Sequence, residues 1–105
     1  MNTAEPKRTQ NVFLVLLALS NGAKHGYEIS KYLETKSSGV FRVPFGSLYP
    51  VLHKLEQEKM IVARWDGMDT QKPRKVYSLT PRGTKALEDE LQRHRANNSA
   101  IDRLT

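Results

Sequence analysis

Cysteine is absent from this chain of 105 residues. Without thiols the protein can form no disulfide, no cysteine-ligated zinc finger and no thiol nucleophile. Its histidines, His25, His53 and His94, lack the spacing of a metal site, so we expect no metal and no other cofactor. The sequence also lacks a Gly-rich phosphate loop and a nucleophile placed beside a base. We therefore predict no catalytic residues and expect that the chain is not an enzyme.

Long hydrophobic runs are absent as well. The longest is Val12–Leu19, eight residues, whereas a membrane-spanning helix needs about 20. This run follows Lys7 and Arg8 and precedes Ser20–Ala23, an order that imitates a short secretory signal peptide. Cleavage after this run would remove it and leave too few apolar residues to form a core. We therefore interpret the run as a buried first helix, with the signal peptide as the alternative, and expect a cytoplasmic protein without a membrane partner.

Negative charge is scarce, with 11 Asp and Glu residues against 17 Lys and Arg residues and a formal net charge of +6. The length suits one domain, since domains usually have about 100–150 residues. Residues 61–87 contain six basic and two acidic side chains, whereas residues 88–105 contain three basic and four acidic ones. Because basic surfaces attract polyanions, we expect region 61–87 to meet phosphate groups if the partner is a nucleic acid.

Helical periodicity dominates the first 60 residues. The first helix contains Pro6 near its start and ends before Gly22, and the second covers about 26–36. In the third, apolar residues recur at i, i+3, i+4 and i+7, which predicts one buried face. These residues are Leu48, Val51, Leu52 and Leu55. The outward face then carries Ser47, Tyr49, Pro50, His53 and Lys54, and we expect Pro50 to lie near the first turn, where its missing N–H costs little.

The pattern then changes to the alternation of β-strands. Two alternating runs, 61–65 and 75–79, flank a polar loop that is too long for a tight turn. We expect Trp65 to pack in the core or against the hairpin, with stacking on a ligand as the alternative. Thr80 and Pro81 are typical of a helix N-cap and first helical residue, and the last helix extends to Asn97 or beyond.

These elements predict a mainly α-helical fold with a small β-hairpin, that is, a winged helix-turn-helix. We expect a winged-helix DNA-binding domain in residues 1–80 and a C-terminal dimerisation helix in residues 81–105, together one structural unit. A recognition helix near 46–59 would enter the major groove, and a wing at 66–75 would reach flanking DNA.

A dimer is expected from the apolar surfaces of the first and last helices. The last helix carries an approximate a/d seam, which His94 and Asn98 interrupt, so it would be a marginal interface alone. The first helix is apolar nearly all round and would share the interface. The candidate interface residues are Val12, Leu16, Leu87, Leu91 and Ile101.

Four sequence blocks, in the same order and at the same spacing, resemble the PadR family of bacterial transcriptional regulators over about residues 12–90. The block Gly46–Glu56, with the pattern G-S-L-Y-P-x-L-x-x-L-E, is the most specific. The other three are His25–Ile29, Ile61–Trp65 and Arg74–Gly83. The short chain is similar to the compact branch of the family, which has a single C-terminal helix.

The resemblance implies a homodimeric repressor that binds pseudo-palindromic operator DNA and is released by a small-molecule effector. By position, the implied DNA-binding residues are His25, Tyr27, Ser47, Tyr49, Pro50, His53, Lys54, Lys72, Arg74 and Lys75. Some drug-sensing relatives place a Trp on the C-terminal helix, where a pair stacks a planar ligand. The only Trp here is Trp65, on the hairpin, so the effector is either absent or different.

Structural alternatives exist for each of these residues. Tyr49 could cover the edge of the core, His53 and Lys54 could be solvated, and the wing cations could be a solvated rim. At the level of function, the alternative is a winged-helix module that binds protein and not DNA. That module would need an apolar, uncharged outward face on the third helix, which the polar residues there disfavour.

Overall fold

The structure is a computed structural model that describes the backbone of residues 4–104 and the side chains of residues 10–95. Helices dominate and a small antiparallel sheet completes the fold, so the predicted mainly α-helical fold class is confirmed. The elements, in chain order, are α1 (Ala4–Ser20), β1 (Lys24–His25), α2 (Gly26–Lys36), α3 (Phe45–Gln57), β2 (Ile61–Asp66), β3 (Arg74–Leu79) and α4 (Pro81–Leu104).

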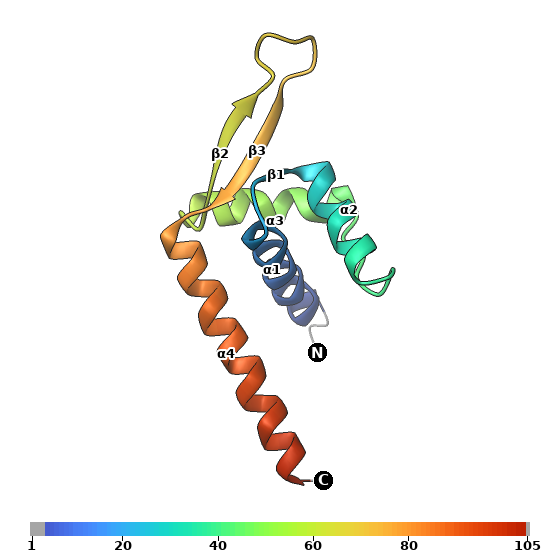
Figure 1. Cartoon of the computed structure of the whole chain (residues 1–105), viewed down its shortest axis with the longest axis vertical. Helices are drawn as coiled ribbons and strands as arrows, with labels where there is room; N and C mark the ends of the chain where they lie inside the picture. The colour runs from blue at the N-terminus through green and yellow to red at the C-terminus, as the bar shows by residue number, and fades with distance from the viewer. Residues whose placement is uncertain (1–3, 105) are drawn as a thin grey trace.

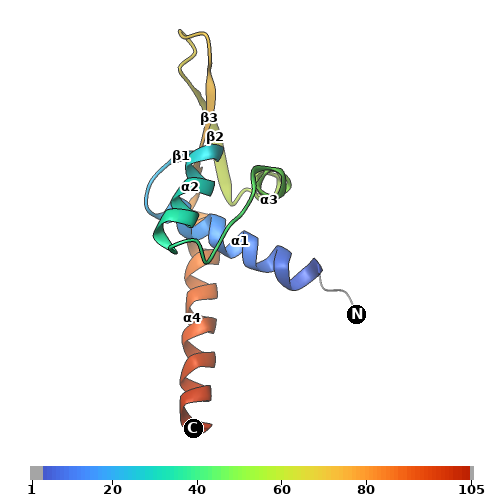
Figure 2. The same ribbon diagram turned by 90° about the vertical axis from the view of Figure 1, so that its right-hand side faces the viewer.

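Helix α1 lies at the centre of this arrangement. It contacts α2, α3, α4 and strand β3. The β2–β3 hairpin projects from one end of the molecule and α4 extends from the other, with α3 lying across the base of the hairpin (Figure 1). In the view turned by 90° from Figure 1, α1 points away from the long axis of α4 at a steep angle (Figure 2). The wing and the DNA-facing surface expected from the sequence are therefore at the end opposite to the tip of α4.

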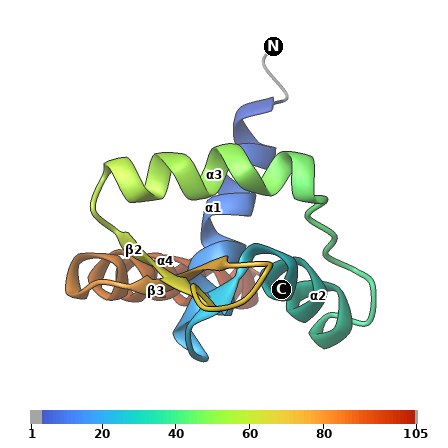
Figure 3. The ribbon, with the colours of Figure 1, turned by 90° about the horizontal axis from the view of Figure 1, so that it is seen from above.

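The core forms where α1, α2 and α3 meet. In α1, Val15 and Ala18 are completely buried, and in α2 the same is true of Ile29. All four apolar residues of the predicted stripe on α3 are buried, which confirms its orientation. Full burial of a Val, Leu or Ile side chain stabilises a fold by about 1.5–3 kcal/mol, so this cluster fixes α3 firmly. Viewed from above, α3 lies along one side and the hairpin with α4 along the other (Figure 3).

The sheet has three strands in the order β1-β3-β2, all antiparallel. The hairpin register runs from Ile61 opposite Leu79 to Asp66 opposite Arg74. Strand β1 was not predicted, because two residues are too few to show an alternating pattern. It pairs Lys24 with Tyr77 and so attaches the start of α2 to the base of the wing.

Thr80 anchors α4 to the turn before β2. Its hydroxyl donates to the carbonyl of Lys59 at 2.7 Å and accepts from the N–H of Gly83 at 3.1 Å. Its own N–H donates to the carbonyl of Met60 at 3.1 Å. The predicted helix start at Thr80 and Pro81 is thus confirmed, and the cap also ties α4 to the end of α3.

Two of the predicted interface residues need correction. Leu16 is 2% exposed and Leu87 is 5% exposed, so both side chains are already used by the core of a single chain. Val12 and Leu91 are half-buried and keep surface for a partner. Ile101 lies outside the residues whose side chains are described. Between residues 4 and 104, no helix has both the length and the apolar character that crossing a membrane requires.

Gly83 is predicted to be essential to the packing of α4. A Cβ at this position would collide with the carbonyl of Met60 and press on Leu79. Gly83→Ala should therefore lower the free energy of unfolding by about 1–3 kcal/mol, as overpacked sites do, measured by urea denaturation. Gly46→Ala is the matched control, since its Cβ would meet nothing within 4 Å, and it should leave stability unchanged or slightly raised. Equal stabilities of the two variants would contradict this account.

Candidate nucleic-acid interface

The outward face of α3 carries the predicted polar and aromatic residues. Their side chains are exposed, while the opposite face of the helix is buried. Tyr49 is 53% exposed, so it does not merely cover the edge of the core. The residues of this face are Ser47, Tyr49, Pro50, His53 and Lys54.

The N-terminus of α3 is uncapped by any side chain in the part of the chain that the structure describes. Pro44 is the N-cap residue, and its carbonyl accepts hydrogen bonds from the N–H groups of Ser47 and Leu48, both at 2.9 Å. The first turn contains no acidic residue. Unpaired N–H groups and the helix dipole favour an anion at such an end, which suits a DNA phosphate.

Pro50 lies deeper in α3 than the sequence suggested. The helix begins at Phe45, so Pro50 is in its interior and not in its first turn. A proline has no N–H to donate, and the carbonyl four residues earlier, that of Gly46, loses its usual helical partner. This carbonyl lies near the start of α3, beside the exposed face, where it is one more hydrogen-bond acceptor.

His25 connects α2 to the wing. Its Nδ1 accepts the N–H of Glu28 at 3.3 Å, and the Glu28 carboxylate accepts the N–H of His25 at 3.0 Å, a reciprocal capping box. In the neutral tautomer that makes this cap, the proton is on Nε2, which lies 3.2 Å from the Glu28 carboxylate. Arg74 Nη1 is 3.0 Å from the same Nε2. Because an arginine N–H can only donate, Nε2 accepts from Arg74 when the ring is protonated at Nδ1, and it faces the Glu28 carboxylate as a donor in the other tautomer.

The predicted basic residues of the wing, Lys72, Arg74 and Lys75, differ in how exposed their side chains are. Its tip turns at Gly67, whose carbonyl accepts from the hydroxyl of Thr70 at 2.6 Å. Lys72 is exposed on this loop. Lys75 lies opposite Trp65 near the loop end of the hairpin ladder, with Nζ 3.6 Å from the carboxylate of Glu56 on α3. An ion pair at this exposure contributes only about 0–1 kcal/mol, so it orients Lys75 more than it stabilises the fold.

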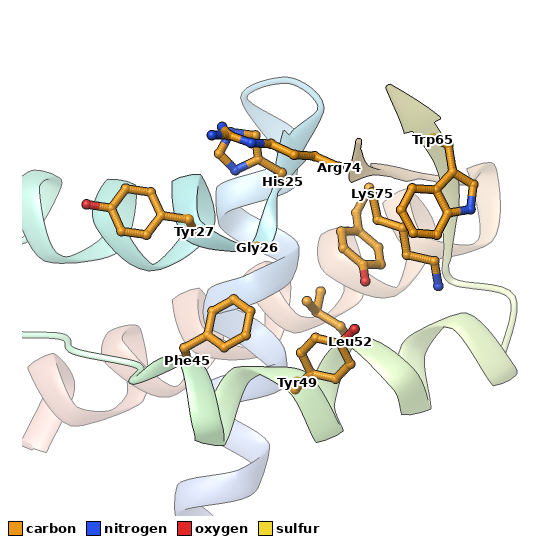
Figure 4. Close-up of a pocket in the computed structure, with 10 residues that line it drawn as sticks. His25, Gly26, Tyr27, Phe45, Tyr49, Leu52, Trp65, Arg74 and Lys75 are labelled. Carbon is orange, nitrogen blue, oxygen red and sulfur yellow. The ribbon is translucent and has the colours of Figure 1, made fainter. Parts of the chain in front are cut away.

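A cavity of about 380 Å³ lies between the start of α3, the start of α2 and the wing. Phe45 and Tyr49 rise from α3 toward it, and Trp65 faces them from strand β2 (Figure 4). Trp65 is 56% exposed, so of its two expected locations the core is excluded and a position on the hairpin remains. Trp65 follows Ile61 and Ala63 on the same face of β2, but it lies where the strand extends past the core. The cavity is lined by His25, Gly26, Tyr27, Phe45, Tyr49, Leu52, Trp65, Arg74, Lys75 and Tyr77.

Tyr77 is the most buried polar residue of this lining. Burial raises the pKa of its phenol above the usual value, and the nearby Tyr49 and Glu56 raise it further. The hydroxyl therefore stays protonated at neutral pH and is a hydrogen-bond donor at the wall of the cavity.

The structure thus brings half of the predicted DNA-binding residues together. His25, Tyr27, Tyr49, Arg74 and Lys75 line the cavity, while the other five lie on the outward face of α3 or on the wing loop. Sequence reasoning missed Phe45, although an aromatic residue four positions before Tyr49 on a helix was a usable signal. Within the described residues, no cluster of three metal-ligating side chains is present.

The profile of the "Transcriptional regulator PadR-like family" matches residues 15–89. The chain belongs to this family. The resemblance seen in the sequence is confirmed, and so is the expectation that the chain is not an enzyme, because the PadR-like proteins are transcriptional regulators.

Among curated relatives, the negative transcriptional regulator PadR of Bacillus subtilis is 32% identical over 82 residues. The match covers 78% of this chain and 45% of the relative, so this PadR-like chain spans less than half of that protein's length.

Solved structures of other transcriptional regulators have a similar fold. The Bacillus subtilis PadR in complex with operator DNA is 30% identical, with a TM-score of 0.70 over 76% of this chain and 44% of that one. A transcriptional regulator from Clostridium thermocellum gives a TM-score of 0.81 over 98% and 97% of the two chains, at 22% identity, and shows the shared fold.

The raised pKa of Tyr77 predicts a specific loss of stability at high pH. The folded state holds this proton more tightly than the unfolded chain, whose tyrosines ionise near pH 10, so the stabilisation is present below that pH and is lost above it. Tyr77→Phe should therefore reduce the fall in melting temperature between pH 8 and pH 11. Tyr27→Phe, at an exposed position, is the control. An unchanged alkaline fall in the Tyr77 variant would contradict the assignment.

Proposed function

We propose that this chain is a sequence-specific DNA-binding transcriptional regulator that acts as a homodimeric repressor. The observation that carries the proposal is the exposed polar face of α3, with its uncapped N-terminus, beside a basic wing. A relative of 30% identity with the same fold was solved in complex with operator DNA. The net positive charge of residues 61–87 suits the same partner.

The proposed docking follows from the positions of the two elements. The N-terminal half of α3 enters the major groove, where Ser47, Tyr49 and His53 meet base edges and Lys54 and the N–H groups of the first turn meet phosphate. The wing, with Lys72 and Arg74, lies on the flanking backbone. His25 and Tyr27 contact phosphate from the start of α2.

A second copy of the chain would cover the groove between α1 and α4. Phe13 of α1 and His94 of α4 stack there, with ring centroids 4.7 Å apart. A second cavity, of about 510 Å³, lies beside them and has a largely apolar lining that includes Leu14, Leu17 and Phe41. Together with the half-buried Val12 and Leu91, this surface supports an interface made by both helices.

Repression is proposed because the Bacillus subtilis relative is a negative regulator. A repressor is useful only when it can be released from its operator, so the proposal includes a small-molecule effector. It also includes a location in the cytoplasm, where bacterial DNA is found. A dimer would place its two recognition helices about 34 Å apart, on half-sites one helical turn from each other in a pseudo-palindromic operator.

DNA binding is tested by fluorescence anisotropy on the duplex upstream of the gene for this chain, titrated with salt. If each protomer neutralises about 3–5 phosphates, log K against log salt should have a slope of about −5 to −9. Arg74→Ala should weaken binding and reduce the magnitude of this slope by about 1 for each protomer, while Tyr49→Ala should abolish retardation of the duplex in a gel.

Arg93→Ala is the matched control, because it removes the same charge from α4, where Arg93 pairs with Glu90. It should bind DNA like the wild-type protein. All three variants should keep the wild-type melting temperature, since their side chains lie outside the core. A wild-type slope near −1, or no binding at low salt, would contradict the proposal and favour the protein-interaction module.

The dimer is tested by analytical ultracentrifugation. The wild-type protein should sediment with twice the chain mass of 12.0 kDa. Leu91→Asp, which places a charge on the proposed interface, should shift the protein toward monomer, because an unpaired charge is costly to bury. Gln92→Asp, on the exposed side of α4, should not. Circular dichroism would verify that both variants fold, and a monomeric wild-type protein would refute the dimer.

A further inference from the structure

Phe45 places an exposed aromatic ring at the start of α3. It is the first residue of the helix and its side chain is 52% exposed, whereas the apolar stripe that follows it on the helix is buried. Single exposed apolar residues are common on protein surfaces, but Phe45 is not isolated. Tyr49, one turn later, is 53% exposed, and the two rings lie 5.6 Å apart at an angle of 56°. Phe45 and Tyr49 together form an aromatic corner that belongs to no part of the core.

The start of α2 fixes the position of the Phe45 ring. A Cβ at Gly26 would lie 3.1 Å from Cε2 of Phe45, so a larger residue there would press on the ring. Phe45 therefore packs against the backbone of Gly26 on one side and near Tyr49 on the other. Figure 4 shows both rings rising from α3 toward the cavity. The aromatic corner thus presents a fixed apolar surface at the end of α3 that faces α2 and the wing.

The charges around the aromatic corner favour DNA as the partner that covers it. The N-terminus of α3 has no side-chain cap and no acidic residue in its first turn, and Lys72 and Arg74 are exposed on the wing. A polyanion complements these groups. In the proposed docking the N-terminal half of α3 enters the major groove, so this inference rests on the proposed function. Trp65, across the cavity, belongs to the wing, and the aromatic corner is the apolar surface that reaches base edges.

The major groove offers such a ring one kind of favourable contact. Most groups on the base edges are hydrogen-bond donors and acceptors, which would lose water and stay unpaired against an aromatic side chain. The exception is the C5-methyl group of thymine, an apolar group that projects into the groove. An exposed aromatic ring at the start of the recognition helix is therefore complementary to thymine.

We propose that Phe45, supported by Tyr49, determines specificity by contacting the C5-methyl group of a thymine in each operator half-site. The contact selects thymine by burial of the methyl group and not by a hydrogen bond. The polar side chains of Ser47 and His53, farther along α3, are left to read the donors and acceptors of neighbouring bases. Phe45 is thus a specificity-determining residue that the polar pattern of α3 does not include.

Replacement of thymine by deoxyuridine tests this contact, because it removes the methyl group and keeps the base pairing. The duplex upstream of the gene for this chain is prepared once with thymine and once with deoxyuridine throughout, and both affinities are measured by fluorescence anisotropy. Burial of one methyl group contributes about fourfold in affinity, so the two half-sites of a dimer together give about 15-fold. The wild-type protein should bind the deoxyuridine duplex more weakly by about this ratio.

Variants of Phe45 then assign the ratio to this side chain. Phe45→Ala should bind the two duplexes with nearly equal affinity, whereas Phe45→Leu, which keeps an apolar side chain, should retain most of the preference for thymine. Phe41→Ala is the matched control, because Phe41 is a partly exposed phenylalanine that lines the cavity between α1 and α4. It should keep the wild-type ratio.

Each failure has its own signature. Equal binding of both duplexes by the wild-type protein would overturn the thymine contact. If Phe45 only supported the fold, Phe45→Ala would weaken both duplexes by the same factor and keep the wild-type ratio, which would overturn the role assigned to Phe45. If the wild-type protein does not bind the thymine duplex, the proposed function fails and this inference fails with it.

Discussion

Burial of helix α1 is the constraint on which the rest of the structure depends. Its residues from Leu14 to Leu19 are apolar on every side, and four other elements must cover them. Each Val or Leu side chain that is fully buried there contributes about 1.5–3 kcal/mol, which is a large fraction of the roughly 5–15 kcal/mol by which a small domain is stable. Packing against the apolar surface of α1 therefore determines the positions of α2, α3, α4 and β3. Their outward faces are free of that requirement and carry the polar residues.

The functional surface is a consequence of this packing. Because the buried stripe of α3 faces the core, Tyr49 and the other polar residues must face outward, and β1 holds the start of α2 beside the wing. His25, Tyr49 and Arg74 come from three elements that are distant in sequence, yet they border one cavity. The polar contacts within it are few and weak. The geometry of the site thus comes from core packing around α1, while its charge comes from the wing.

Periodicity was sufficient to predict the four helices and the hairpin, because each has a repeated pattern of burial. It failed where burial does not follow a local pattern. Strand β1 is too short to show one, and Trp65 continues the alternation of Ile61 and Ala63 beyond the end of the core, where the same spacing no longer means burial. Pro50 was expected near the first turn but lies in the interior of α3, because the helix begins at Phe45, where no polar N-cap residue marks its start. The outward residues of α3 were predicted well. The cavity could not be, since it exists only where α2, α3 and the wing meet.

The central claim is that the outward face of α3 and the wing together form the surface that binds DNA. The most direct measurement is a ¹H–¹⁵N NMR titration of the whole protein with the duplex upstream of its gene. The account predicts that the amide resonances perturbed most are those of Phe45–Lys54 and of residues 67–75, with little change along α4 beyond Leu91. Perturbations concentrated on α4, with those of α3 and the wing unmoved, would contradict it.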